Sequence, residues 1–395
     1  MRVHIVHILE AAVGGTRRHL NDLVFGLDDK RFRQTVIVSP MRETSFQLDM
    51  ERMQRAGVSV HVVPMRRAIA PLHDCVAFWR LAALLYRVRP DVVHCHSAKA
   101  GFLGRLVGEF LRTTVPRSRS AKLIYTPHAF PFLMRVGFAK RCFYLALERF
   151  VARFTDAIVC VSLSEQRAAL DARLCSVDKL VVIENGIEIP NDKSMMTVRE
   201  ARVKIRRNWS MPDDSLIVGC VADFREQKGH RVLVDAAQRV IADVPNVRFM
   251  LVGDGELRRP LERLCEKRGV REQFVFAGRH EDARSFYAAF DLLVQPSFWE
   301  GGPYAPLEAA AKGLVVVATR VIGNRDVVRH GETGLLVPPD DEMALADAII
   351  ALLHDDILRR SMGEQGRMWV RERFSLRFQL GETEALYEQL LHGER

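Results

Sequence analysis

Short apolar runs rich in β-branched residues alternate with longer amphipathic stretches along most of this chain of 395 residues. Strands that are separated by helical stretches of roughly 10–15 residues indicate βαβ units, in which a helix connects two parallel strands. The strands are expected at residues 3–9, 35–38, 59–63, 91–95, 122–126, 157–161 and 180–184, and then at 216–221, 247–252, 274–276, 292–295, 314–318 and 335–337. The pattern therefore predicts an α/β fold with parallel sheets.

A polar stretch with several Gly and Pro residues interrupts this alternation at residues 186–212. A chain of this length also exceeds the usual size of a single hydrophobic core. We therefore expect one Rossmann-like domain at residues 1–190 and a second one at residues 191–375. The helical pattern near the C-terminus predicts that residues 376–395 form a final helix that packs back on the first domain.

The net charge of +9 is concentrated in the first half of the chain. Residues 1–190 contain 28 Lys and Arg against 17 Asp and Glu, whereas the remainder contains 30 against 32. A basic domain beside a neutral one indicates an anionic partner, such as a nucleic acid, a membrane surface or a substrate. The chain has no zinc finger, RNA-recognition signature or basic zipper, which argues against nucleic acid.

Residues 130–154 contain seven aromatic residues and five Lys or Arg with a single acidic residue. Such a stretch is typical either of a surface that lies on an anionic membrane or of a core helix with a solvated basic face. The basic charge of the first half favours the membrane. The chain has no uninterrupted apolar run of about 18 residues, no cleavable signal pattern and no C-x-x-C pair among its seven cysteines. We expect a cytoplasmic protein, peripheral on the inner face of the membrane.

The most informative segment is residues 295–319, QPSFWEGGPYAPLEAAAKGLVVVAT. A strand ends near Pro296, a loop rich in Gly and Pro follows, and a helix is expected to begin near Pro306. Glu300 and Glu308 are expected at the carboxyl ends of the strands, where open α/β sheets bind ligands. Carboxylates at that place suit vicinal hydroxyl groups, which can donate two hydrogen bonds to one carboxylate. The alternative is that Glu308 only stabilises the helix start and that Glu300 is solvated.

This segment resembles the E-x7-E signature of family 4 of the retaining glycosyltransferases, which have the GT-B fold. The resemblance extends through residues 323–328 (GNRDVV) and 331–337 (GETGLLV). Two departures are Asn324, where many relatives have a second glycine, and the pair Gly302-Pro303, where many have an aromatic residue and a glycine. The resemblance implies two Rossmann-like domains whose parallel sheets face each other across a cleft.

The resemblance also implies the residues that bind the donor in this segment. Glu300 is expected to orient the transferred sugar, and Glu308 is expected to hold the ribose. The remaining donor-binding candidates are Gly301, Gly302, Pro303, Tyr304 and Ala305.

Three stretches upstream match the same family. In residues 223–229 (DFREQKG), Arg225 and Lys228 stand where the family has a basic pair that stabilises the leaving diphosphate. Solvated loop charges are the alternative. Gly253 lies in LVGDG, which is not a dinucleotide-binding G-x-G-x-x-G pattern, and Arg279 and His280 stand near the expected nucleobase.

The first domain matches more loosely. Gly14 and Gly15 form the glycine loop that the family places against the donor phosphates, and His128 stands where a histidine points toward the transferred sugar. Residues 94–101 (HCHSAKAG) resemble the subset of the family that extends lipid-linked oligosaccharides. Lys99, at the expected start of a helix, is a candidate for contact with an acceptor phosphate.

The sequence gives no complete set of metal ligands. His94, His96 and His128 are suitable ligand types, but no full set follows from their spacing. The chain also has no D-x-D pair at a strand end for a donor-bound Mg²⁺. We therefore expect no metal and no cofactor, with the nucleotide sugar as co-substrate.

The resemblance implies a retaining glycosyltransferase that uses a nucleotide sugar, with UDP as the favoured nucleotide. It would transfer a hexose or N-acetylhexosamine to a hydroxyl group of a lipid-linked saccharide in exopolysaccharide, capsule or O-antigen assembly. Two alternatives remain. One is an epimerase of the same fold that acts on a sugar nucleotide, and the other is a basic protein that binds membrane or nucleic acid and has an inactive sugar site.

Overall fold

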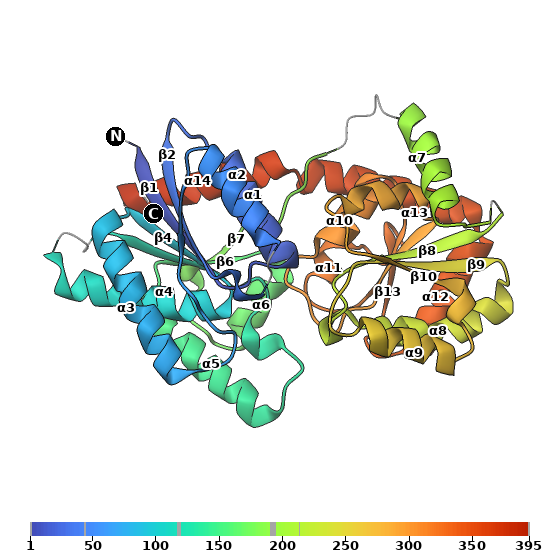
Figure 1. Cartoon of the computed structure of the whole chain (residues 1–395), viewed down its shortest axis with the longest axis horizontal. Coiled ribbons are helices and arrows are strands. Elements are labelled where there is room, and N and C mark those ends of the chain that lie inside the picture. Colours follow the sequence, from blue (N-terminus) through green and yellow to red (C-terminus); the bar gives the residue numbers. More distant parts are fainter. Residues whose placement is uncertain (1, 43–44, 117–119, 190–194, 213, 394–395) are drawn as a thin grey trace. The chain divides into compact units, whose positions relative to one another are not determined.

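The computed structural model describes residues 2–42, 45–116, 120–189, 195–212 and 214–393 (Figure 1). The chain divides into two compact units. Unit 1 comprises Met1–Asn185 and Arg377–Arg395, and unit 2 comprises Gly186–Leu376. The last helix therefore belongs to unit 1, although unit 2 precedes it in the sequence.

Unit 1 contains a parallel sheet of seven strands in the order β3-β2-β1-β4-β5-β6-β7. Strands β1 and β4 are neighbours, and the strand order reverses at this point. Loops that follow such a pair diverge and leave room for a ligand at the carboxyl ends of the strands. The strands are β1 (Val3–Leu9), β2 (Phe32–Val38), β3 (Ser59–Val62), β4 (Val92–His96), β5 (Lys122–Thr126), β6 (Ala157–Cys160) and β7 (Leu180–Val182).

Helices cover both faces of this sheet (Figure 1). They are α1 (Gly14–Gly26), α2 (Phe46–Arg55), α3 (Pro71–Val88), α4 (Ala98–Thr114), α5 (Phe138–Ala152), α6 (Leu163–Asp171) and α14 (Leu376–His392), with short 3₁₀ helices η1 (Pro40–Arg42), η3 (Pro131–Leu133) and η4 (Val177–Lys179). Helix α14 is fixed to the sheet by Tyr387, which is fully buried and whose hydroxyl lies 2.7 Å from Nδ1 of His94. Arg31 forms ion pairs with Glu384 and Glu388 of the same helix.

Unit 2 contains a parallel sheet of six strands in the order β10-β9-β8-β11-β12-β13. The strand order reverses between β8 and β11. Open α/β sheets bind ligands at such a reversal, beside the loops that follow the two strands. The strands are β8 (Leu216–Val221), β9 (Val247–Val252), β10 (Phe274–Gly278), β11 (Leu292–Gln295), β12 (Val316–Thr319) and β13 (Gly334–Val337).

The helices of unit 2 also lie on both faces of its sheet (Figure 1). They are α7 (Met195–Asn208), α8 (His230–Asp243), α9 (Arg258–Lys267), α10 (Tyr304–Ala311), α11 (Asn324–Val327), α12 (Glu342–His354) and α13 (Asp356–Arg373), with 3₁₀ helices η6 (Glu226–Lys228), η7 (Arg271–Gln273) and η8 (Ala283–Ala289). Asp341 and Asp355 begin α12 and α13 by accepting hydrogen bonds from backbone N–H groups of the first turns.

The predicted α/β class with two parallel sheets is confirmed. The central strands are apolar on both faces because helices cover both sides, and all four residues of β12 are buried. The helix expected near Pro306 begins two residues earlier, at Tyr304. In the part of the chain that the structure describes, no helix has the length and apolar character needed to span a bilayer.

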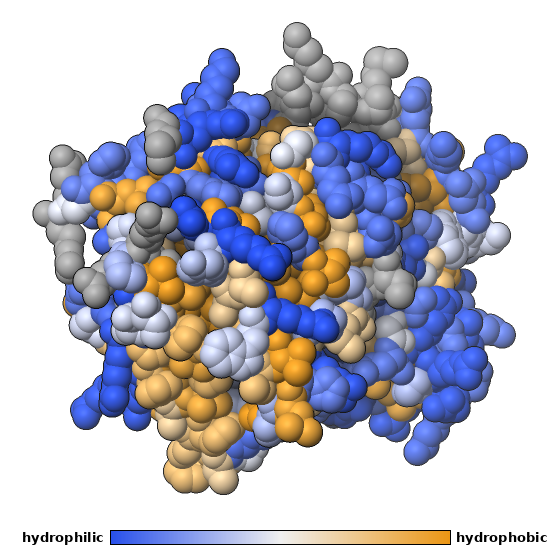
Figure 2. All heavy atoms as spheres, turned by 60° about the vertical axis from the view of Figure 1, so that its left-hand side comes forward, coloured by the Kyte–Doolittle hydropathy of each residue, from blue (hydrophilic) through white to orange (hydrophobic). Residues whose placement is uncertain are grey.

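The aromatic and basic stretch at residues 130–154 divides between core and surface. Phe130 and Phe132 are buried, whereas Phe138 on α5 is 83% exposed. Figure 2 shows apolar side chains gathered into a patch on one face of the molecule. The exposed apolar side chains of α3 and α5 are Leu72, Val76, Trp79, Tyr86, Phe138, Phe143 and Phe150.

Candidate active site

The loop between β11 and α10 carries the buried carboxylate of Glu300, which is 5% exposed. Its Oε1 accepts hydrogen bonds from Nζ of Lys228 (2.7 Å), Nε2 of Gln295 (2.8 Å) and Oγ of Ser297 (2.7 Å). Gln295 ends β11, and Lys228 belongs to the loop after β8. The reversal of strand order thus brings together two residues that lie 72 positions apart in the sequence. Three donors fix the position of this carboxylate.

The loop after β8 carries Arg225 just before η6. Arg225 is partly exposed, and its guanidinium has no hydrogen-bond or ion-pair partner among the described residues. The charge of Lys228 is paired with that of Glu300, whereas Arg225 has no ion-pair partner among the described residues. Gly229 ends η6 at φ +65°, and a Cβ there would lie 1.9 Å from the carbonyl oxygen of Pro296. Only glycine permits this close approach of the two loops.

Glu308 lies on α10, and its Oε2 accepts a hydrogen bond of 2.9 Å from the hydroxyl of Tyr287. No described side chain caps the start of α10, where Pro303 is the last residue before the helix. Gly301, Pro303 and Tyr304, at or just before this start, are buried. Gly302 and Ala305, also candidates from the sequence, are partly exposed. The backbone N–H groups at this helix start, directly after the Gly/Pro loop, are suited to an anion.

The remaining candidates of unit 2 lie in neighbouring loops. Gly253 follows β9, and a Cβ there would lie 2.0 Å from the carbonyl oxygen of Ala222. Backbone packing is thus enough to explain this glycine. Arg279 and His280 are exposed after β10. Arg279 approaches Oδ1 of Asp223 at 3.4 Å, and Nε2 of His280 donates to the carbonyl oxygen of Ala277 at 3.0 Å.

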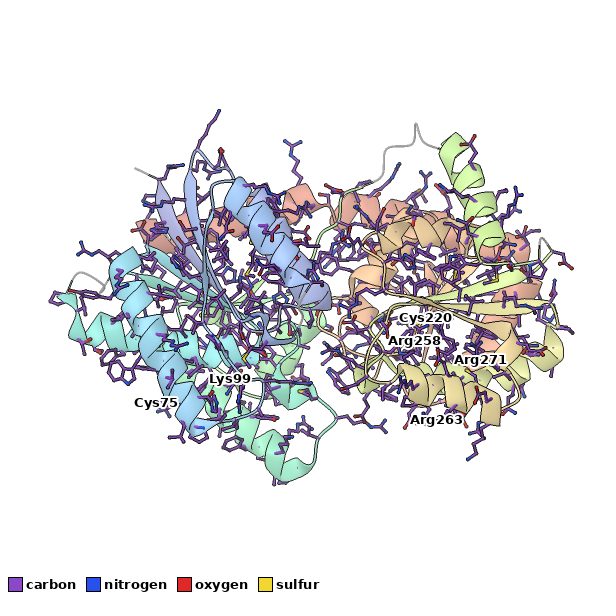
Figure 3. The ribbon with its side chains drawn as sticks, in the orientation of Figure 1. Cys75, Lys99, Cys220, Arg258, Arg263 and Arg271 are labelled. Atoms are coloured by element: carbon purple, nitrogen blue, oxygen red, sulfur yellow. The ribbon has the colours of Figure 1, made fainter. Side chains whose placement is uncertain are left out.

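In unit 1, Gly14 and Gly15 form the exposed start of α1. Lys99 lies in the first turn of α4 and is 10% exposed (Figure 3). Its Nζ donates to both oxygens of Asp74 on α3, at 2.9 and 2.7 Å. The sequence reasoning did not find this partner, because only the packing of α3 on α4 brings the two residues together. The positive charge of Lys99 is therefore balanced.

His128 follows β5 in a strained turn, with φ of +54° at His128 and +87° at Ala129. The turn is held by Glu165, whose side chain is fully buried. Oε1 of Glu165 accepts from the backbone N–H of Ala129, and Oε2 accepts from that of Val161, both at 2.8 Å. Strain of this kind persists only where the surroundings enforce it, and it is common at functional sites.

Sequence reasoning did not identify Glu165. A signal was available, because Ser162 and Glu165 have the S-x-x-E spacing that begins helices. Ser162 does begin α6, and its hydroxyl accepts a hydrogen bond of 3.2 Å from the backbone N–H of Glu165.

Five histidines meet in unit 1, two more than the sequence had suggested. His7 and His19 join His94, His96 and His128, and ring centroids of neighbouring pairs lie between 4.1 and 5.7 Å apart. Burial lowers the pKa of His7 to about 3 and that of His19 to about 4. Burial likewise holds the pKa of His94, His96 and His128 well below the usual value. All five imidazoles are therefore neutral at neutral pH.

Two domain families match the chain in succession. The family described as glycosyl transferase 4-like domain matches residues 14–186, and that described as glycosyl transferases group 1 matches residues 201–369. The capsular polysaccharide biosynthesis glycosyltransferase CapM of Staphylococcus aureus is 26% identical over 84% of this chain and 85% of its own length. An Escherichia coli protein, UDP-Gal:alpha-D-GlcNAc-diphosphoundecaprenol alpha-1,3-galactosyltransferase, is 26% identical over 74% of each chain.

Solved structures show the same fold. The crystal structure of Anabaena HepE in complex with UDP and glucose has a TM-score of 0.81 at 20% identity, covering 98% of this chain and 100% of that one. Both matching families are glycosyl transferase families. The strand order of the two parallel sheets and the position of the Glu300 loop agree with this match. The chain belongs to the group 1 glycosyl transferases and has the GT-B fold.

Proposed function

We propose that this glycosyltransferase moves a hexose or N-acetylhexosamine from a UDP-linked donor to a hydroxyl group of a lipid-linked saccharide, with retention of the anomeric configuration. The pathway would be the assembly of exopolysaccharide, capsule or O-antigen. The proposed binding of the donor rests on the ion pair of buried Glu300 with Lys228, at the point where the strand order of the second sheet reverses. The proposed acceptor is supported by the names of the two relatives, which cite capsular polysaccharide and a diphosphoundecaprenol-linked acceptor.

The donor would be bound by unit 2. The ribose hydroxyls would donate to Glu308, which Tyr287 holds in position. The diphosphate would face Arg225, Lys228 and the loop at Gly301 and Gly302. Positive charge and backbone N–H groups stabilise a leaving diphosphate in a site from which water is excluded. We propose that no metal takes part, since these groups supply the positive charge.

The reaction would break the bond between the anomeric carbon and the phosphate oxygen and form a bond to the acceptor oxygen on the same face of the sugar. The leaving phosphate would take the acceptor proton, so no strong base is required. In unit 2, Glu300 would orient the sugar. In unit 1, the neutral imidazole of His128 offers one donor and one acceptor nitrogen, which suits contact with a saccharide hydroxyl.

The acceptor would be bound by unit 1, where Lys99 would meet the phosphate of a lipid diphosphate. This phosphate would replace Asp74 as the partner of Lys99. The patch on α3 and α5 supports contact with a membrane, because Leu72 is 84% exposed and Phe138 is 83% exposed. Exposed basic residues lie on the same two helices, at Arg80, Lys140 and Arg141. Apolar side chains with basic neighbours suit an anionic leaflet, so we place the protein on the cytoplasmic face.

The test is an incubation of UDP-sugars with a synthetic polyprenyl diphosphate saccharide in excess EDTA. We expect one UDP-sugar to give a product whose new linkage has the donor's anomeric configuration, as read by NMR coupling constants. Glu300→Gln should lower the rate at least about 10²-fold, and Glu256→Gln, a matched change at an exposed carboxylate, should not. An altered sugar nucleotide formed without acceptor would instead support the epimerase, and an inverted linkage would contradict retention.

A further inference from the structure

The turn after β5 has a backbone conformation that residues other than glycine rarely adopt. Both His128 and Ala129 have a positive φ, of +54° and +87°. A residue held in such a region costs on the order of 1–3 kcal/mol, so the conformation persists only where its surroundings enforce it. A turn that is enforced at this cost indicates a function for a side chain that it presents.

The ring of His128 is held on two sides and has one nitrogen left for a ligand. Its Nε2 lies 3.4 Å from Nδ1 of His96. The ring also meets the ring of His19 edge-on, with 4.6 Å between the centroids. Nδ1 of His128 has no hydrogen-bond partner among the described residues, and His128 is partly exposed. Nδ1 is therefore the nitrogen available to a saccharide hydroxyl.

The side chain that enforces this turn is that of Glu165. It lies in the first turn of α6 and is fully buried. Its Oε1 accepts a hydrogen bond from the backbone N–H of Ala129, and its Oε2 accepts one from that of Val161, both at 2.8 Å. Val161 directly follows β6, the neighbour of β5 in the sheet. One carboxylate thus ties the strained turn to the end of the adjacent strand.

This pair of hydrogen bonds requires two acceptor oxygens on one side chain. Both oxygens of a carboxylate accept hydrogen bonds, whereas glutamine has one acceptor oxygen and an amide group that only donates. In Glu165→Gln, either orientation of the amide would therefore place a donor against one of the two backbone N–H groups. The substitution disturbs the attachment of the turn without changing the size of the side chain.

We propose that Glu165 is a positioning residue for sugar transfer, which holds the turn so that Nδ1 of His128 meets a saccharide hydroxyl. This inference rests on the proposed function, because it assigns Glu165 a part in that reaction. Glu165 is fully enclosed, so it acts through His128 and not by contact with a substrate. Misplacement of a group by about 1 Å can lower a reaction rate about 10²-fold, so the support of this turn should be visible in the rate.

The first measurement is NMR of the histidine rings of the full chain, without any sugar. The ring signals of His128 should shift in Glu165→Gln, because the turn that presents the ring is disturbed. Glu148→Gln, a matched change of a buried carboxylate on α5 of the same unit, should leave them in place. Unchanged His128 signals in Glu165→Gln would overturn the proposal, whatever the activity of the protein.

The second measurement is sugar transfer by wild type, Glu165→Gln, His128→Ala and the double variant. We expect Glu165→Gln to lower kcat about 10-fold or more. When residue 128 is already alanine, the same change should lower kcat less than about 2-fold, because the two residues act as one unit. Equal factors in the two backgrounds would overturn the proposal. Glu165→Asp, which keeps both oxygens but is one methylene shorter, is a second variant for the same cycle.

A general loss of structure is separated from this effect by the nucleotide. Because UDP is expected in unit 2, its effect on the melting temperature should be the same in Glu165→Gln as in wild type. A variant that also loses the UDP shift has a general defect, which would likewise overturn the proposal. Failure of the proposed function has a different signature, since the wild type itself would then transfer no sugar.

Discussion

Replacing Arg225 with alanine is expected to lower the rate constant of sugar transfer by about 10²–10³-fold, equivalent to about 2.7–4 kcal/mol of transition-state stabilisation. The free energy of unfolding should change by no more than about 0.5 kcal/mol. The transfer rate should fall without a matching loss of stability, because the guanidinium of Arg225 has no hydrogen-bond or ion-pair partner in the described part of the chain. Its removal breaks no hydrogen bond or ion pair among the described residues, yet it removes a positive charge from this loop.

Lys228 is a less informative position for the same test. Its ammonium group forms the ion pair with Glu300 at 2.7 Å. Its removal would leave a buried carboxylate without its cation, which is destabilising in itself. A loss of activity in Lys228→Ala would therefore combine a change in structure with a change in chemistry.

The measurement is steady-state transfer with saturating acceptor, together with thermal unfolding, for wild type, Arg225→Ala and Arg231→Ala. Arg231 lies on α8, and its side chain is 58% exposed. Its replacement removes the same charge from the same unit and should leave transfer nearly unchanged. Arg225→Lys should fall between the two, because an ammonium keeps the charge but not the planar pair of donors. Equal rates in the two alanine variants would remove Arg225 from the active site.

Replacing Glu148 with glutamine is expected to destabilise unit 1 by about 3–5 kcal/mol. Arg105 on α4 is fully buried, and its Nη2 donates to Oε2 of Glu148 on α5 at 2.7 Å. Its guanidinium also lies 3.8 Å from the ring centroid of Tyr125, whose hydroxyl donates to Oε1 of Glu148. Glutamine would leave the arginine charge buried without a compensating anion.

Denaturant unfolding measures this loss of stability. Amide hydrogen exchange then shows whether the loss lies in unit 1. The double variant Arg105→Met/Glu148→Leu should recover most of the lost stability, because an apolar pair of similar volume is often as stable as a buried ion pair. Arg31→Met is the control, since Arg31 is 42% exposed and each of its ion pairs, with Glu384 and Glu388, should contribute at most about 1 kcal/mol. If Glu148→Gln cost no more than Arg31→Met, the buried pair would not stabilise this unit.

The sheets were predictable because the strands are buried on both faces and are therefore apolar runs with clear ends. The expected strand at residues 216–221 appears as β8, Leu216–Val221, and the one at 247–252 as β9, Val247–Val252. The helix start at Tyr304 was missed by two residues, because Pro306 is equally acceptable elsewhere in a first turn.

The candidate site was predictable only as separate segments. The loops at Arg225 and Glu300 follow adjacent strands, but the sequence does not give the strand order, so the Lys228–Glu300 ion pair could not be predicted. The same reason applies to Lys99 and Asp74, which meet only because α3 packs on α4.

Two members of the histidine cluster, His7 and His19, were missed for a different reason. His7 and His19 lie on β1 and α1, in stretches that read as an apolar strand and an amphipathic helix. A single histidine in such a stretch is usually a core residue, and only the neighbouring positions of β1, β4 and β5 reveal the cluster.

The central claim, a nucleotide-sugar site in unit 2, is tested most directly by thermal unfolding with UDP, GDP and ADP in EDTA, for wild type, Glu308→Ala and the exposed control Glu256→Ala. A ligand at 100 times its dissociation constant adds about 2.7 kcal/mol to the stability of the state that binds it. The account predicts that UDP raises the melting temperature of wild type and of Glu256→Ala, and that Glu308→Ala loses this shift. If no nucleotide at millimolar concentration shifts the wild type, the donor site is contradicted.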